Sequence, residues 1–162
     1  MSVYIPPNSV GVFNRGFLVK KAAQTPPNSG SSSTLYTVAG GAVLITGLYG
    51  RVSTVINGTT GAIALGTAPT VGTANTTGIA TAGVIGGAEV GTYVAVGVAS
   101  SGLAGALVVG SSKQAGASLF LGQPAFTAFT GTITITTSVA TMTGAIDWYL
   151  TYVPVDTGST VS

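Results

Sequence analysis

The feature that most constrains the fold is an alternation of apolar and polar residues in two runs between Gly131 and Val153. In the first run, threonines alternate with Ile133 and Ile135, which is the period of a strand with one buried face. In the second run, large apolar side chains occupy every other position: Ile146, Trp148, Leu150 and Tyr152. Both runs therefore predict strands that turn one face toward a core.

The second run also predicts its own register. A slip of one residue would expose Trp148, the only tryptophan, and would bury the charged Asp147. Because a turn region around Thr141 to Gly144 separates the two runs, the strands are predicted to pair as a hairpin. The hairpin should end at Pro154, which cannot donate a hydrogen bond to a sheet.

Composition extends the strand prediction to most of the chain. The sequence has 162 residues, enough for one domain with a real core, and 25 of them are glycines. Glycine costs about 1 kcal/mol per helical position, and the abundant threonines are stiff at the first side-chain torsion, so helices are disfavoured. A hydrophobic content of 46% argues against disorder over most of the length.

Glycine-containing pairs predict further turns. Gly40-Gly41 separates two short apolar runs. Asn57-Gly58 lies between RVSTVI and TTGAIAL, and it favours the type I′ hairpin turn, in which both central residues need a positive φ. Together with the later apolar runs, these signals give about eight to ten short strands, at a spacing typical of a sandwich or barrel. We therefore predict an all-β fold, an antiparallel β-sandwich.

Residues 1–34 differ in composition from the rest of the chain. They contain the sequence Pro-Pro-Asn-Ser twice, and paired prolines favour extended geometry outside sheets. One interpretation is a disordered terminus with a short piece of strand. The other is an extended N-terminal arm that docks on a partner through apolar and basic side chains: Phe13, Arg15, Phe17, Leu18, Lys20 and Lys21. We expect the arm over 1–34, the sandwich over 35–153 and a polar tail over 154–162.

Charge and hydropathy limit the classes of partner. Only 5% of the residues are charged, and the net charge of +2 is too small to indicate nucleic-acid binding. The N-terminus lacks the basic region and continuous apolar run of a signal peptide. The uncharged segment from Thr92 to Gly110 is interrupted by serines and glycines, and its valines alternate as in strands, so strands are preferred over a membrane span. We expect neither direct nucleic-acid contact nor a membrane partner.

Few residues are suited to catalysis. Histidine and cysteine are absent, which excludes Ser-His-Asp chemistry, His-ligated metals and thiol chemistry. Three isolated carboxylates do not readily build a metal cage or a glycosidase pair. Asp156 begins an Asp-Thr-Gly-Ser match to aspartic proteases, but it stands alone near the C-terminus, and Ser112-Lys113 is better explained as a solvated turn. We predict no enzymatic activity, catalytic residue, cofactor or metal site.

Two blocks of the sequence resemble small head proteins of tailed bacteriophages, which decorate or cement the capsid. The blocks are LYTVAGGAVLITGLYGRVSTVI, starting at Leu35, and GAIDWYLTYVPVDTGSTV, ending at Val161. The resemblance implies a sandwich of jelly-roll type and a trimer at local threefold positions on the major capsid protein. It also implies a place on the virion exterior, after assembly in the host cytoplasm. The segment 1–34 is not covered by it.

Composition and resemblance together predict a structural, non-enzymatic cement protein that stabilises a phage head. A chain with so little charge would associate, with copies of itself and a shell covering much of its surface. The alternative is a receptor- or glycan-binding module of a tail fibre or surface adhesin. That module would use exposed aromatic side chains: Tyr4, Tyr49, Tyr93 or Tyr149. Tyrosines at strand edges are also common as core or interface filler.

Overall fold

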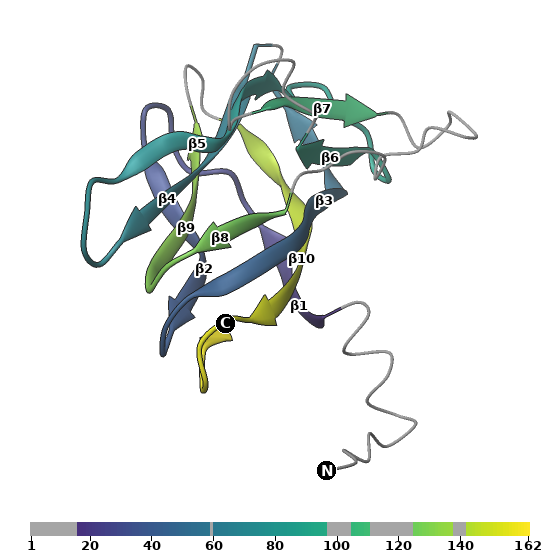
Figure 1. The fold of residues 1–162 in the computed structure, drawn as a ribbon. Coiled ribbons are helices and arrows are strands. Elements are labelled where there is room, and N and C mark those ends of the chain that lie inside the picture. Colours follow the sequence, from purple (N-terminus) through teal and green to yellow (C-terminus); the bar gives the residue numbers. More distant parts are fainter. Residues whose placement is uncertain (1–15, 59, 97–104, 111–124, 138–141) are drawn as a thin grey trace, which may run out of the picture.

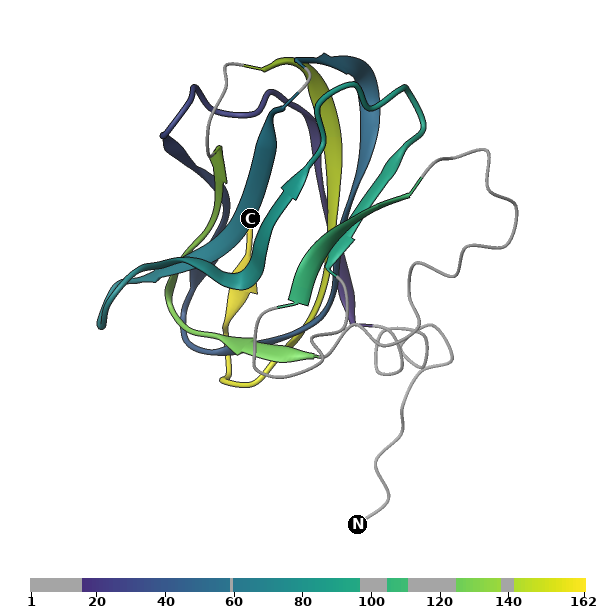
Figure 2. The same cartoon turned by 90° about the horizontal axis from the view of Figure 1, so that it is seen from above.

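The computed structural model describes residues 16–58, 60–96, 105–110, 125–137 and 142–162. Within these ranges every regular element is a strand, and two antiparallel sheets pack face to face as a β-sandwich (Figure 1, Figure 2). The all-β antiparallel sandwich expected from the sequence is confirmed. Its jelly-roll type stays a prediction.

Eleven strands make up the described part of the sandwich. In chain order they are β1 Phe17–Gln24, β2 Ser32–Ala39, β3 Val43–Asn57, β4 Ala62–Pro69, β5 Asn75–Val84, β6 Tyr93–Val96, β7 Gly105–Gly110, β8 Phe126–Ala128, β9 Gly131–Thr137, β10 Thr143–Pro154 and β11 Thr160–Val161. One sheet, which we call sheet A, has the order β1-β10-β3-β6, with β8 also paired to β3. Sheet B has the order β5-β4-β9-β2-β11. β7 pairs antiparallel with β6 and parallel with β5, so it joins the two sheets along one side.

Three connections predicted as hairpins are crossovers between the sheets. The strands flanking Gly40-Gly41, those flanking Asn57-Gly58, and the pair β9 and β10 are each divided between sheet A and sheet B. Gly40, Gly41 and Gly58 have positive φ angles of 75°, 130° and 117°. Asn57 does not have a positive φ, so the type I′ turn does not form. The hairpin predictions were therefore wrong.

The physical reason is that alternation fixes the face a strand turns to the core, but not the neighbour with which it pairs. In a sandwich both sheets bury their inner faces in the same core, so a turn can lead the chain to either sheet. β10 pairs with β1 and β3, whereas β9 pairs with β2 and β4. Figure 2 shows the result, with β10 (yellow) in one layer and β9 in the other.

The inner face of β10 lies at the centre of the core, as its alternation predicted. Its large side chains are all buried: Ile146, Trp148, Leu150 and Tyr152. Gly50 lies opposite Trp148 on β3, where an added Cβ atom would come within 2.7 Å of Ile146 Cγ2 and 3.1 Å of the indole carbon Cε3. The strand also ends at Pro154, as expected. The inward face predicted for this strand is confirmed.

The sandwich begins earlier and ends later than the sequence predicted. Phe17–Gln24, assigned to the arm over 1–34, is the edge strand β1, which pairs antiparallel with β10. β2 likewise begins at Ser32, before the expected boundary at residue 35. Val161, in the expected polar tail over 154–162, is buried where β11 pairs with β2. Residues 1–15 lie outside the described residues, so an extended arm there stays a prediction.

One interpretation of residues 1–34 allowed a short piece of strand, but the sequence did not place that strand in the sandwich because its apolar pattern is weak. Among the described strands β1 pairs with β10 alone, and Val19 is its side chain that packs, partly buried, against the core. Lys20 and Lys21 interrupt the alternation, and lysines at a sheet edge discourage pairing with a further strand. Part of the segment interpreted as a basic arm is therefore a protected sheet edge.

Replacing Trp148 by alanine should strongly destabilise or unfold the sandwich. Truncation of a fully buried tryptophan costs about 3–5 kcal/mol in the free energy of unfolding. Chemical denaturation followed by circular dichroism measures the loss. The control is Val55→Ala at an exposed position of β3, which should cost less than about 1 kcal/mol. A Trp148→Ala protein as stable as its parent would contradict the assigned core.

Candidate functional site

Three tyrosines from three neighbouring strands form a row on the outer face of sheet A. The alternation that turns Trp148 inward turns Tyr149 of β10 outward, and the register places Tyr149 opposite Tyr49 of β3. These two rings stack, with centroids 4.9 Å apart and an interplanar angle of 11°. Tyr93 of β6 continues the row, with its centroid 6.4 Å from that of Tyr49 and an interplanar angle of 41°. We call Tyr49, Tyr93 and Tyr149 the tyrosine row.

Lys20 extends the tyrosine row to the edge of the sheet. It lies opposite Tyr149 in the β1–β10 register, and its Nζ atom lies 5.4 Å from the centroid of that ring. Because β1 and β3 flank β10 on opposite sides, Lys20 and Tyr49 contact opposite faces of the Tyr149 ring. The same Nζ atom forms an ion pair of 2.9 Å with Asp147 Oδ2. Asp147 first, and then Tyr149, raise the pKa of Lys20.

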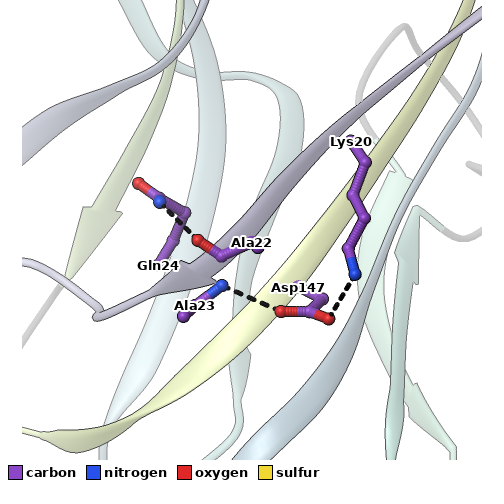
Figure 3. Close-up of polar contacts among 5 residues, drawn as sticks. All are labelled: Lys20, Ala22, Ala23, Gln24 and Asp147. Atoms are coloured by element: carbon purple, nitrogen blue, oxygen red, sulfur yellow. Dashed lines mark hydrogen bonds and ion pairs between the residues drawn. The ribbon is translucent and has the colours of Figure 1, made fainter.

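Asp147 connects β1 to β10 through both of its carboxylate oxygens (Figure 3). Its Oδ1 accepts a hydrogen bond of 2.8 Å from the backbone N–H of Ala23, while its Oδ2 pairs with Lys20. Ala23 has a positive φ of 50° and lies where the pairing shifts between Lys21 and Gln24, as in a β-bulge. The Ala23 N–H, followed by Lys20, lowers the pKa of Asp147. Asp147 thus neutralises Lys20 and anchors the bulge.

Arg51 of β3 is the base on this face that has no ion pair within the described residues. It is exposed, and it lies opposite Asp147 in the β3–β10 register and opposite Tyr93 in the β3–β6 register. The Asp147 carboxylate pairs with Lys20 instead. Among the described residues, no acid is therefore paired with this guanidinium, which lies beside the phenols of the tyrosine row.

The predicted basic docking residues have different positions on the structure. Lys20 joins the tyrosine row, whereas Lys21 lies opposite Trp148 on the side of β1 that faces the core. Phe13 and Arg15 lie outside the described residues. Of the predicted basic residues that are described, only Lys20 is therefore part of the outer face.

The apolar docking residues of β1 are exposed but tied into the sandwich. Phe17 is 46% exposed, and its ring centroid lies 5.5 Å from that of Tyr152. Leu18 is 61% exposed on the outer face. From sheet B, the buried Tyr36 donates a hydrogen bond of 3.4 Å to the carbonyl oxygen of Val19. These contacts make β1 part of the folded domain.

The structure brings together tyrosines that the sequence had named separately. Tyr49, Tyr93 and Tyr149 form the tyrosine row, and Tyr4 lies outside the described residues. Sequence reasoning missed Arg51 and Asp147 as members of the site. The alternation along β10 could have predicted that the Asp147 side chain points outward. The position of Asp147 opposite Arg51 could not have been predicted, since no local signal gives the register of two strands so far apart in sequence.

A second exposed surface lies where loops meet at one end of the sandwich. Val71 and Phe129 are 91% and 66% exposed, and they line a shallow hollow of about 230 Å³ together with Asp156. Asp156 Oδ2 accepts a hydrogen bond of 2.7 Å from the backbone N–H of Ala42. The Asp-Thr-Gly-Ser match therefore forms a turn between β10 and β11 in which the aspartate holds a neighbouring loop.

Neither a metal-binding cluster nor a membrane-spanning helix is found among the described residues. They contain no cluster of three or more His, Cys, Asp or Glu side chains that could hold a metal ion. No helix among them is long and apolar enough to cross a membrane. Ser112-Lys113 lies outside the described residues. Comparison of the chain with protein-family models, curated proteins and solved structures found no match.

Replacing Asp147 by asparagine should loosen β1 near neutral pH but not in acid. Since the pKa of Asp147 is lowered in the folded protein, its carboxylate stabilises β1 above the ordinary aspartate pKa of about 3.9. That contribution is lost as the pH falls through the lowered pKa. The amide hydrogens of β1 should exchange faster in Asp147→Asn than in the parent near neutral pH, and equally fast in acid.

The measurement is hydrogen exchange followed by NMR, comparing parent and variant at each pH. Asp156→Asn is the control, because Asp156 contacts the loop at Ala42 and not β1. Equal protection of β1 in the parent and Asp147→Asn near neutral pH would show that the carboxylate does not hold the strand.

Proposed function

We propose that this chain is a structural, non-enzymatic protein that attaches to the outside of a protein shell and stabilises it, as decoration or cement proteins of tailed-bacteriophage heads do. The observation that carries the proposal is the outer face of sheet A, where the tyrosine row, Lys20 and Arg51 form an ordered surface rather than a catalytic cleft. Tyrosine and arginine are the residue types that dominate binding energy at protein interfaces.

Composition and sequence resemblance support the same proposal. The first block that resembles phage head proteins covers most of β2 and β3, and the second covers most of β10 and all of β11. A chain with 5% charged residues and apolar side chains exposed at Val71 and Phe129 is suited to an assembly that covers part of its surface. The partners in this proposal are the major capsid protein and further copies of the chain.

Electron microscopy of particles purified from the source of the sequence tests the proposed function. A gold-labelled antibody against the chain should mark the outside of phage heads, and the chain should sediment with them. As the control, an unrelated tagged β-sandwich protein is added to the same particles and is then detected with an antibody against that protein. Heads that carry no label, with the chain found only in the unsedimented fraction, would contradict the proposal.

The second candidate is a glycan- or receptor-binding module, and the clustering of the tyrosine row on one exposed sheet face favours it. It predicts binding to isolated sugars or receptor domains without a shell. A glycan array probed with the purified chain separates the two candidates. A cement protein should give no signal above background, whereas a glycan-binding module should bind particular sugars.

The free protein should be a compact oligomer, and the resemblance indicates a trimer. The low charge and the exposed apolar side chains promote association of copies. Sedimentation equilibrium at micromolar concentration should give three times the chain mass of 15.8 kDa. A monomer that persists across that concentration range would count against the cement proposal.

A further inference from the structure

We propose that the outer face of sheet A, formed by the tyrosine row, Lys20 and Arg51, is the surface that docks on a partner protein rich in carboxylates. This inference rests on the proposed function and deepens it by naming the docking face and the chemistry of the partner. It assigns the attachment to the folded sheet, whereas the sequence had assigned it to an N-terminal arm.

Tyr149 offers the edge of its ring to a partner more than its ring faces, because both faces have a neighbour. Lys20 and Tyr49 contact the two faces of Tyr149. Tyr49 in turn lies between Tyr149 and Tyr93. A sugar ring that stacks on an aromatic side chain needs an open ring face, so these contacts disfavour a glycan stacked on Tyr149. The edge of an aromatic ring carries partial positive charge and attracts acceptor oxygens.

The polar groups of the face act as hydrogen-bond donors. Burial, and then the neighbouring phenols of Tyr149 and Tyr93, raise the pKa of Tyr49, so its hydroxyl stays protonated at neutral pH. Arg51 is exposed, and a guanidinium binds a carboxylate through two parallel N–H donors. Asp147 pairs with Lys20, which leaves the Arg51 guanidinium without an ion pair within the described residues. Protonated phenols and a guanidinium together fit carboxylate oxygens.

The distribution of charge favours an acidic partner. All bases in the described residues lie on two strands of sheet A: Lys20 and Lys21 on β1 and Arg51 on β3. Asp147 is the acid on these strands and their β10 neighbour, whereas Glu89 and Asp156 lie in loops. Complementary potentials steer association and suppress wrong partners. Rigid tyrosines beside an unpaired arginine are typical of protein interfaces, which favours an acidic protein over an acidic glycan.

The edge beside this face is poorly suited to docking by strand addition. Lys20 and Lys21 lie on β1, and the bulge at Ala23 interrupts the register of β1 with β10. Lysines and bulges are devices that protect a sheet edge from a further strand. A partner is therefore expected to contact side chains of the face and not the backbone of β1.

Poly-L-glutamate is the probe for the test, titrated into full-length protein with isotope-labelled tyrosine rings and followed by NMR. Tyrosine-to-phenylalanine variants assign the ring signals. We expect the signals of Tyr49, Tyr93 and Tyr149 to shift, and that of the buried Tyr36 to stay unchanged. Arg51→Gln should raise the dissociation constant about tenfold, as expected for a lost charge-assisted pair.

Lys21→Gln is the matched control, because it removes the same charge from the core-facing side of β1. It should raise the dissociation constant less than about twofold. Equal effects of Arg51→Gln and Lys21→Gln, or tyrosine signals that do not respond to poly-L-glutamate, would overturn the proposal. Tighter binding of polygalacturonate or of neutral cellohexaose would also overturn it, because either result would make the face a glycan site.

The docking face and the proposed function can fail separately. If phage heads bind the parent and Arg51→Gln equally well, as seen with the gold-labelled antibody, the cement function is supported and the proposed docking face is overturned. Tyrosine signals that respond to poly-L-glutamate, combined with unlabelled heads, would support the face as an acidic-protein site and contradict the cement function.

Discussion

The pairing of β10 with β3 is the contact on which both the core and the candidate site depend. One register places Trp148 opposite Gly50 on the inner face and Tyr149 opposite Tyr49 on the outer face. A residue without a side chain is needed at this position, because a Cβ atom at Gly50 would clash with Ile146 and crowd the indole of Trp148. A shift by one residue would therefore expose the tryptophan and separate the stacked tyrosines in the same step. The stability of the fold and the geometry of the site are thus coupled through one pair of strands.

The opposite edge of β10 carries β1, and Asp147 determines how β1 is held there. Its carboxylate pairs with Lys20 and accepts the N–H of Ala23, so the charge of Lys20 is neutralised while that of Arg51 remains. The same contacts place the Lys20 ammonium against the Tyr149 ring. If a partner docks on this face as proposed, these contacts would lower the entropy cost of ordering Lys20 and Tyr149.

The sequence contained the directions of side chains but not the partners of strands. Alternation correctly predicted that Ile133 and Ile135 of β9 and the large apolar side chains of β10 are buried. In β9 the intervening Thr134 is buried as well, so the expected exposed polar face is not found at that position. The hairpins were wrong since Gly40-Gly41 and Asn57-Gly58 are equally compatible with a crossover between sheets. β1 was assigned to the arm and not to the sandwich because an edge strand needs few apolar residues. The proximity of Arg51 to Asp147 follows from a register between distant segments, which no local pattern encodes.

The measurement that tests this account most directly is a set of nuclear Overhauser contacts across β10 in the free protein. The pairing of β10 with β3 predicts backbone contacts between Trp148 and Gly50, and between Tyr149 and Tyr49. A hairpin of β9 with β10 would instead place the backbone of β10 beside Ile133 or Ile135. Contacts to Gly50 and Tyr49 are the expected result, and contacts between the backbones of β9 and β10 would contradict the account.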